Sequence, residues 1–270
     1  KFNNLSNNLN QYYVGREFGE IWGYVSDGYY TIDDFDLEKA KTNTWVLKEG
    51  VTKINGYTPK PGDEKFKDLD GNGVINNGAN TLDNPGDMKI IGNSTQRFQF
   101  GANLGVGYKG FDLSVMLQGV GKRDVTLGGH ALFPFGGAGA DGVFHPVYAN
   151  QTDYWQAISY DPEDPNYMVA KNPNAKLFRV YGQQGNVGSN TRTSTKYLQD
   201  GSYMRVKNVT LSYTFPTQWI QKIHLNQCRL YVSVENLATF TSLPDGFDPE
   251  NLSWSYPFYR TWSVGANISF

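Results

Sequence analysis

The feature that most constrains this chain is a two-residue alternation of apolar and small polar side chains. In the last ten residues, TWSVGANISF, every second position from Trp262 to Phe270 is apolar, and the positions between are Thr, Ser, Gly and Asn. Successive side chains of a β-strand point to opposite faces, so the pattern predicts a strand with one apolar and one polar face. The chain ends on an aromatic residue inside this pattern, where a frayed polar tail would be usual.

The same alternation predicts further strands. They are expected in 97–121, as two strands joined by a tight turn at Lys109-Gly110, and in 203–215 and 228–236. Another strand is expected within 17–25, and a helix is expected only over 217–223. The sequence therefore predicts an all-β fold with about six strands.

The connections between these strands differ in length. The short connections are Lys109-Gly110 and 216–227. The long connections, which are rich in Gly, Asn, Asp and Pro, are 28–96, 122–200 and 241–260. Short turns at one end and long extracellular loops at the other are typical of a transmembrane antiparallel β-barrel of an outer membrane.

The composition of the two strand faces favours such a barrel over a soluble β-sandwich. A soluble sandwich carries Lys and Glu on its solvated face. Here the polar positions are mostly Gly, Ser, Thr, Asn and Gln, and the apolar positions carry no charge. Aromatic residues gather near the strand ends, as interfacial girdles require, at Phe98, Tyr108, Phe111, Phe215, Trp262 and Phe270.

Composition argues against several other classes of protein. The net charge is −2 and there is no long basic run, so nucleic acid is not expected as a partner. No segment approaches the roughly 18–20 consecutive apolar residues of a membrane-spanning helix. The three histidines, His130, His145 and His224, have neither metal-ligand nor triad spacing, and we expect no enzyme.

About six strands cannot close a membrane barrel, whose minimum is about eight. We therefore expect the remaining strands to lie upstream of this sequence. The final strand is then expected to pair with the first strand of the barrel, so that no backbone edge stays unpaired in lipid.

Several ordered segments resemble a known family. They are 62–76, 91–122, 198–216, 228–241, 245–250 and 256–270. Together they resemble the C-terminal signature of the SusC/RagA family of TonB-dependent outer-membrane transporters. The matches run in order over most of residues 60–270.

The resemblance implies a 22-stranded barrel with an N-terminal plug, of which residues 1–270 would be the C-terminal portion. It implies TonB-dependent import of an oligosaccharide or peptide cargo, with a SusD-like surface lipoprotein as a lid. It also implies the outer membrane of a Bacteroidetes-like Gram-negative bacterium, with lipid or lipopolysaccharide around the wall. The plug and the segment that contacts TonB have no counterpart here. The aromatic Phe270 resembles the signal that the outer-membrane assembly machinery reads.

The segment FKDLDGNGVIN (66–76) is a candidate cation site with the spacing of an EF-hand loop. A hard cation needs oxygen ligands that converge from alternate residues, with glycine at the sharp turn, and Gly73 stands at position 6. Position 12 is Ala79, where a bidentate Glu is usual. The predicted ligands of a structural Ca²⁺ or Mg²⁺ are Asp68, Asp70, Asn72, Val74, Asn76 and Asp83.

An Asx-rich turn without an ion is the alternative, because Asp, Asn and Gly dominate turns. No cofactor is required by either interpretation.

The long segment 130–156 interleaves aromatic side chains with Asp, Asn and Gln. Sugars are bound by aromatic stacking together with planar amide and carboxylate groups, so this segment is a candidate substrate surface. The predicted substrate-binding residues are Phe144, Tyr148, Asp153, Tyr154 and Trp155. The alternative is that these aromatic side chains pack the loop onto itself or onto the lid protein.

The sequence as a whole predicts a segment of a nutrient importer, with two other classes left open. A passive porin would share the barrel wall but lack a plug. A secreted glycan-binding β-domain would be soluble, and it would bury Trp262, Val264 and Ile268 in its interior.

Overall fold

The computed structural model describes residues 7–128, 132–133, 149–181, 187–252 and 258–270. The chain divides into two compact units. The first, called the loop unit below, comprises 1–94 and 125–198, and the second, called the sheet unit, comprises 95–124 and 199–270. Each helix in the described ranges is too short or too polar to cross a lipid bilayer.

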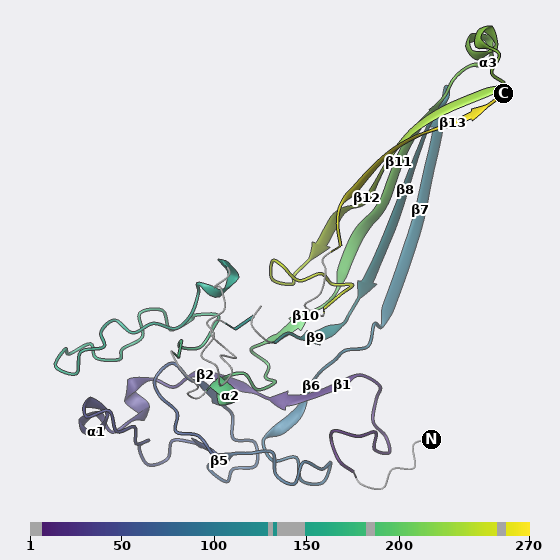
Figure 1. Ribbon diagram of the computed structural model, residues 1–270. Helices are drawn as coiled ribbons and strands as arrows, with labels where there is room; N and C mark the ends of the chain where they lie inside the picture. The colour runs from purple at the N-terminus through teal and green to yellow at the C-terminus, as the bar shows by residue number, and fades with distance from the viewer. Residues whose placement is uncertain (1–6, 129–131, 134–148, 182–186, 253–257) are drawn as a thin grey trace, which may run out of the picture. The chain divides into compact units, whose positions relative to one another are not determined.

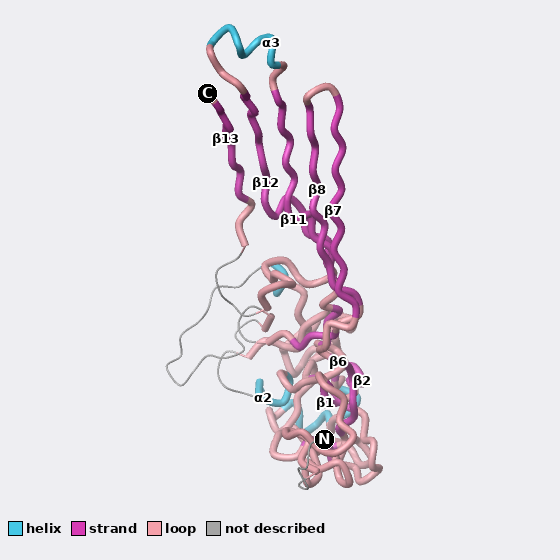
Figure 2. The backbone as a smooth tube through the Cα atoms, turned by 90° about the vertical axis from the view of Figure 1, so that its right-hand side faces the viewer, coloured by secondary structure: helices cyan, strands magenta, loops and turns pink. Residues whose placement is uncertain are grey.

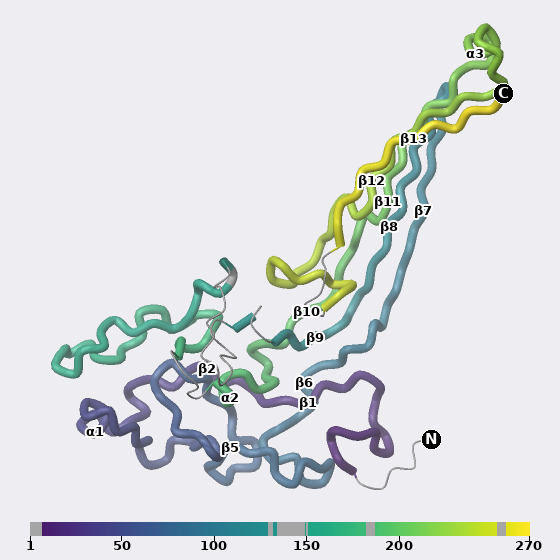
Figure 3. The backbone as a smooth tube through the Cα atoms, viewed as in Figure 1, coloured from purple at the N-terminus to yellow at the C-terminus, as the bar shows by residue number. Residues whose placement is uncertain are grey.

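The sheet unit is built on one five-stranded antiparallel sheet (Figures 1 and 2). Its strands are β7 (Phe98–Tyr108), β8 (Phe111–Gly121), β11 (Tyr203–Thr214), β12 (Gln227–Thr241) and β13 (Thr261–Ser269). They pair in this order, and Figure 3 shows the order as a run of colours from blue in β7 to yellow in β13. The strands predicted in these segments are confirmed.

The two short connections of the sheet have the predicted structures. Lys109 and Gly110 join β7 to β8 with φ angles of 48° and 88°, and two left-handed residues in a row make the tight type I′ hairpin turn. A Cβ atom on Gly110 would lie 2.8 Å from the carbonyl oxygen of Thr214, which adds a steric reason for glycine. The helices α3 (Thr217–Ile220) and η3 (Gln221–Ile223) join β11 to β12.

The strand register places the apolar positions of all five strands on one face, called the apolar face below. One row across the sheet consists of Val106, Leu113, Leu211, Val232 and Val264. Within this row Val106 is 64% exposed and Val264 is 81% exposed. A soluble sandwich would bury such a row under a second sheet, whereas this row is exposed.

Aromatic side chains stand at the strand ends of the apolar face. Beside the β7–β8 turn, the rings of Phe111 and Tyr213 are 4.5 Å apart, and those of Tyr213 and Phe215 are 5.0 Å apart. Trp262, at the start of β13, is 65% exposed. Amphipathic rings at such positions suit the boundary between lipid and water.

The opposite, polar face contains one irregularity. Between Val206 and Asn208 of β11 the register shifts, so that Lys207 has no partner residue in β8. An extra residue of this kind is a β-bulge, which redirects side chains locally. In a regular strand Arg205 would share the apolar face with Val209 and Leu211. With the bulge, Arg205 stands opposite Gln118 on the polar face, where it and Lys207 contact the same acidic segment.

The loop unit contains short strand pairs and short helices. The pairs are β1 (Glu20–Tyr24) with β6 (Met88–Asn93), β2 (Ser26–Tyr29) with β4 (Glu64–Phe66), and β3 (Lys53–Ile54) with β5 (Val74–Ile75). The helices are η1 (Ile32–Asp34), α1 (Leu37–Lys41), η2 (Ala149–Gln151) and α2 (Val187–Asn190). The strands β9 (Asp124–Thr126) and β10 (Leu198–Asp200) lie where the chain passes between the units.

The strand expected within 17–25 is β1, but it pairs with β6 and does not join the five-stranded sheet. A pattern of alternation identifies a strand without identifying its partner, which here lies more than sixty residues away in the sequence.

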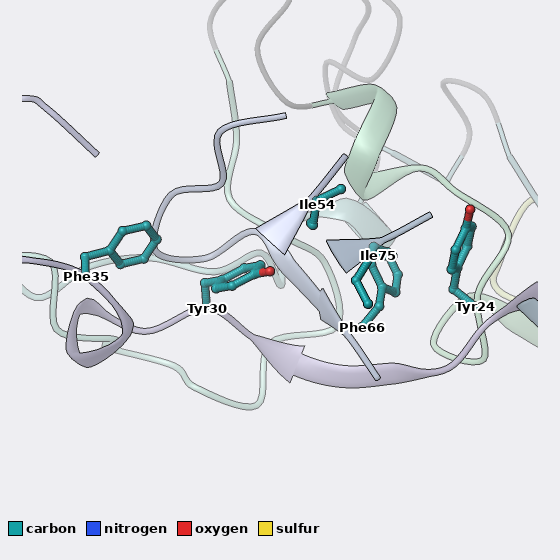
Figure 4. Close-up of a cluster of buried hydrophobic side chains, with 6 residues drawn as sticks. All are labelled: Tyr24, Tyr30, Phe35, Ile54, Phe66 and Ile75. Atoms are coloured by element: carbon teal, nitrogen blue, oxygen red, sulfur yellow. The ribbon is translucent and has the colours of Figure 1, made fainter. Parts of the chain in front are cut away.

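The loop unit has a hydrophobic core of its own, shown in Figure 4. It consists of Tyr24, Tyr30, Phe35, Ile54, Phe66 and Ile75. Tyr30 donates a hydrogen bond to the carbonyl oxygen of Thr52 at 2.7 Å, which satisfies its buried hydroxyl group. The long connections of the sheet are therefore folded around apolar side chains.

We expect Val232→Lys to impair assembly of the sheet, because a lysine at the middle of a lipid-facing surface costs about 2–4 kcal/mol. The matched control is Ser233→Lys, one residue further along β12 on the polar face, which should be tolerated. The amount of folded, heat-modifiable protein in membrane preparations measures the difference. Equal loss of folded protein in both variants would contradict the assignment of the faces.

Candidate functional site

The turn predicted to bind a cation brings three carboxylates together. One carboxylate oxygen from each of Asp68, Asp70 and Asp87 lies within 4.8 Å of the others. Asp87 is fully buried and accepts hydrogen bonds from the backbone N–H groups of Leu69 and Asn76, both at 2.8 Å. The third carboxylate of the turn is thus Asp87, a residue that the spacing of the motif did not indicate.

The other predicted ligands lie within the turn or beside it. Asn72 Oδ1 accepts from the N–H of Val74 at 2.8 Å, and Asn76 Nδ2 donates to the carbonyl of Val74 at 2.7 Å. Asp83 accepts from Asn7 Nδ2 at 3.1 Å and is not one of the three clustered carboxylates. Among the described residues, Asp87 therefore occupies the place that the sequence analysis gave to Asp83.

Backbone hydrogen bonds hold the first carboxylate of the turn. Asp68 accepts from the N–H groups of Gly73 and Gly71, both at 2.7 Å. These bonds, that from Gly73 above all, lower the pKa of the Asp68 carboxyl. The same bonds would form in an Asx-rich turn without an ion, so the local geometry accommodates both interpretations of the sequence.

The predicted aromatic substrate residues have different environments. Phe144 and Tyr148 lie outside the described residues. Trp155 is 1% exposed, and its indole ring lies so close to Gly62 that a Cβ atom there would overlap it. The guanidinium carbon of Arg179 is 5.9 Å from the centre of the same ring. Trp155 is thus a core residue of the loop unit, with no open face for a ligand.

Asp153 and Tyr154 are less enclosed than Trp155. Asp153 is exposed, and its backbone carbonyl accepts from the N–H of Leu177 at 3.0 Å. Tyr154 is half-buried, and its carbonyl accepts from Asn172 Nδ2 at 2.7 Å. Their side chains are held at the surface by an ordered backbone and stay predicted binding residues.

An ion-pair network on the polar face fixes the segment that follows β12. The Arg205 side chain is 2% exposed, and its guanidinium contacts Asp248 at 2.7 Å and Glu250 at 3.0 Å. Lys207 contacts Glu250 at 2.8 Å, and Arg205 Nε donates to Thr239 Oγ1 at 2.8 Å. Charge-assisted bonds of this kind hold a buried guanidinium in one orientation.

This network balances two cations with two carboxylates. The ring of Phe258 lies beside it, 5.5 Å from the Arg205 guanidinium carbon and 5.3 Å from Lys207 Nζ. The sequence analysis did not pair these residues. The available signal was the spacing of Arg205 and Lys207 in one polar-faced strand, together with Asp248 and Glu250 at the same spacing in a later loop.

The loop unit contains a buried carboxyl group in β4. Glu64 is fully buried and accepts a hydrogen bond from Ser194 Oγ at 2.8 Å. Burial raises its pKa to about 7, although hydrogen bonds from Ser194 and Ser26 and the charge of Lys196 act in the opposite direction. Burial of the Lys196 side chain lowers the pKa of its ammonium group, although the charge of Glu64 acts in the opposite direction.

Two curated proteins from the bacterium Formosa agariphila are similar in sequence to this chain, although no protein-family model matches it. TonB-dependent receptor P3 is 29% identical over 276 residues, covering 95% of this chain and 22% of the receptor. TonB-dependent receptor P26 is 24% identical, covering 84% of this chain and 22% of the receptor.

Two solved structures have a similar fold. The RagAB peptide transporter has a TM-score of 0.51 at 17% identity, covering 93% of this chain and 22% of its own. The RagAB peptide importer in the closed-closed state has a TM-score of 0.52 at 18% identity, covering 93% and 23%. This chain is therefore similar in sequence to TonB-dependent receptors and similar in fold to part of the RagAB transporter. It spans 22% of the length of the two receptors from Formosa agariphila.

We expect the loop unit of this chain to lose stability as pH rises from the ordinary carboxyl range to about 7. In the folded state the raised pKa keeps Glu64 neutral up to about pH 7, whereas in the unfolded state the same group ionises at an ordinary carboxyl pKa. Between these two pKa values the unfolded state is stabilised by ionisation and the folded state is not, so the free energy of unfolding falls as pH rises. The loss is up to about 3 kcal/mol between pH 4 and pH 8.

Glu64→Gln should remove most of this pH dependence, and Glu49→Gln at an exposed position should not. The measurement is amide exchange in β2 and β4 of the intact receptor, corrected for the intrinsic effect of pH. An unchanged pH dependence in Glu64→Gln would show that another group is responsible.

Proposed function

We propose that this chain supplies the C-terminal barrel wall and part of the loops of an outer-membrane receptor for TonB-dependent nutrient import. The observation that supports it most strongly is the apolar face. It crosses all five strands without a charged residue, and its row from Val106 to Val264 is exposed. Lipid is the environment in which such a surface is stable.

In this proposal the five strands are the last of a 22-stranded barrel that surrounds a plug supplied by another part of the receptor. The strand β13 would pair with the first strand of the barrel, and β7 with the strand before it. Phe270 would lie at the periplasmic boundary and present the aromatic terminus to the assembly machinery.

The loop unit would stand on the extracellular side, where a SusD-like lipoprotein would cover it. Cargo, an oligosaccharide or a peptide, would be held between the loops and this lid until TonB moved the plug. Import breaks no bond in the cargo, so the polar face needs binding groups and no catalytic ones. The proposal is consistent with the sequence relation to receptors, and the cargo named for the solved structures belongs to those proteins.

A passive porin would also carry this wall, and a soluble glycan-binding domain would not. The soluble alternative requires Val264 and Ile268 in an interior, but they are 81% and 51% exposed. A porin differs from a TonB-dependent receptor because passage through a porin does not require TonB.

The test is uptake by cells that contain the receptor, with and without TonB. Two labelled cargo pools, neutral oligosaccharides and peptides, are given to wild-type, receptor-deleted and TonB-deleted strains. We expect the receptor to be needed for uptake of one pool, and loss of TonB to abolish that uptake. Receptor-dependent uptake that persists without TonB would identify a porin.

We also propose that the turn at 68–76 binds a structural Ca²⁺ or Mg²⁺. The carboxylates of Asp68, Asp70 and Asp87 would supply hard oxygen ligands, and Asn72 and the carbonyl of Val74 would extend the set. The clustering of three carboxylate oxygens supports the proposal, since bringing like charges together without a cation is unfavourable.

Removal of divalent ions with EDTA should then lower the unfolding temperature of the intact receptor. A ligand at one hundred times its dissociation constant stabilises by about 2.7 kcal/mol. Asp70→Asn should reduce the response to EDTA, whereas Asp83→Asn should leave it unchanged. No response of the wild-type receptor would favour the ion-free turn.

A further inference from the structure

The polar face of the sheet contains a hollow lined mainly by uncharged groups, several of which form hydrogen bonds, and it is called the glutamine pocket. Its volume is about 590 Å³, within the range of small-molecule sites. Its lining includes the carboxamides of Gln96, Gln99 and Gln118, the phenol group of Tyr203 and the ring of Phe258.

A glycine on β7 leaves this space open. Gly101 lines the pocket and pairs with Gln118 of β8. A Cβ atom on Gly101 would contact only the carbonyl oxygen of Leu117, at the ordinary distance of 3.6 Å. The backbone would therefore accept a larger residue, and glycine is not needed there for chain geometry. What glycine provides is room on the polar face.

The lining groups bond to one another and keep further bonding capacity. Gln99 Nε2 donates to Gln96 Oε1 at 2.7 Å, and Gln118 Nε2 donates to Tyr203 Oη at 3.4 Å. These contacts do not use the side-chain carbonyl oxygens of Gln99 and Gln118 or the amide group of Gln96. A carboxamide offers two donors and an acceptor, so each of these side chains can bond to a ligand as well.

The charged groups near the pocket cancel one another. Glu250 also lines it, but its carboxylate pairs with Arg205 at 3.0 Å and with Lys207 at 2.8 Å. Asp248 pairs with the same guanidinium at 2.7 Å. A charged ligand would lose its hydration without gaining an unpaired opposite charge, and this is unfavourable. The pocket therefore suits an uncharged polar ligand.

We propose that the glutamine pocket binds one or two rings of a neutral saccharide. Adjacent hydroxyl groups of a sugar donate and accept together, as do the carboxamides. The Tyr203 hydroxyl accepts from Gln118 and donates to Glu250 at 3.4 Å, so it holds the side chain of Gln118 in place. Phe258, which is 48% exposed, adds an aromatic surface for the C–H groups of a ring. The proposal rests on the import function proposed above and narrows its cargo to uncharged glycans.

Two substitutions test the pocket, with a matched control on the same strand. Gly101→Leu fills the space, and Gln118→Met removes a carboxamide at nearly constant volume. Gly105→Leu is the control, because Gly105 lies on the same face of β7, outside this pocket, and its Cβ atom would meet only the carbonyl oxygen of Leu113, at 4.0 Å.

The measurement is binding of the intact, detergent-purified receptor to an array of neutral oligosaccharides and an array of uncharged peptides of similar length. We expect binding to at least one oligosaccharide. Gly101→Leu and Gln118→Met should each weaken it about tenfold or more, and Gly105→Leu should leave it at the wild-type value. Amounts of folded receptor are matched by heat modifiability before binding is compared.

Three results would overturn the proposal: no oligosaccharide bound by the wild type, oligosaccharide binding that Gly101→Leu leaves unchanged, or peptide binding that Gly101→Leu weakens. The uptake assay separates this proposal from the import function. TonB-dependent uptake at the wild-type rate in Gly101→Leu would contradict the pocket alone. Wild-type uptake that is independent of TonB would contradict the import function.

Discussion

Lateral backbone pairing across five strands forces every second side chain onto the same surface, and the rest of the structure depends on this constraint. In this chain those side chains are mostly aliphatic and aromatic, without a charge among them. Exposure of such a surface to water would cost about 25 cal/mol for each Å². A sheet of this kind must be covered, and contact with lipid covers all of it at once.

Because one face of the sheet is apolar, the charged side chains of the strands lie on the other face. The bulge in β11 reverses the alternation, so that Arg205 does not share the apolar face with Val209, and Arg205 and Lys207 both contact Glu250. A buried guanidinium is stable only with partners, and Asp248 and Glu250 supply them from the segment after β12. The position of that loop is thus a consequence of charge burial on the wall, and the neutral pocket beside it follows from the same pairing.

Local patterns in the sequence predicted the elements that depend on near neighbours. The alternation in 97–121 and the pair Lys109-Gly110 specify a hairpin within 25 residues, and the structure contains it. The single predicted helical segment, 217–223, is also helical. Both depend on backbone preferences that a short window contains.

Contacts between distant residues were not predictable in this way. The strand β1 pairs with β6, and the acidic turn closes on Asp87 in place of Asp83, because the chain folds back over an intervening segment. The residues that flank Trp155 in the sequence have the composition of a binding surface. In the structure, however, its side chain packs against Gly62 from a different part of the chain. The periodicity of a sequence indicates which face of its strand a residue occupies. The chemistry of a site depends on which distant segments pack against that face, and periodicity does not indicate this.

The outward direction of the apolar face can be measured most directly by spin-label accessibility along β13 of the intact receptor in lipid. With Cys228 replaced by Ala, labels are placed one at a time from Thr261 to Ser269. The account predicts a two-residue period, with contact to lipid-soluble oxygen at Trp262, Val264, Ala266 and Ile268 and to a water-soluble nickel chelate between them. Protection of these four positions from both reagents would show a buried protein interior and contradict the account.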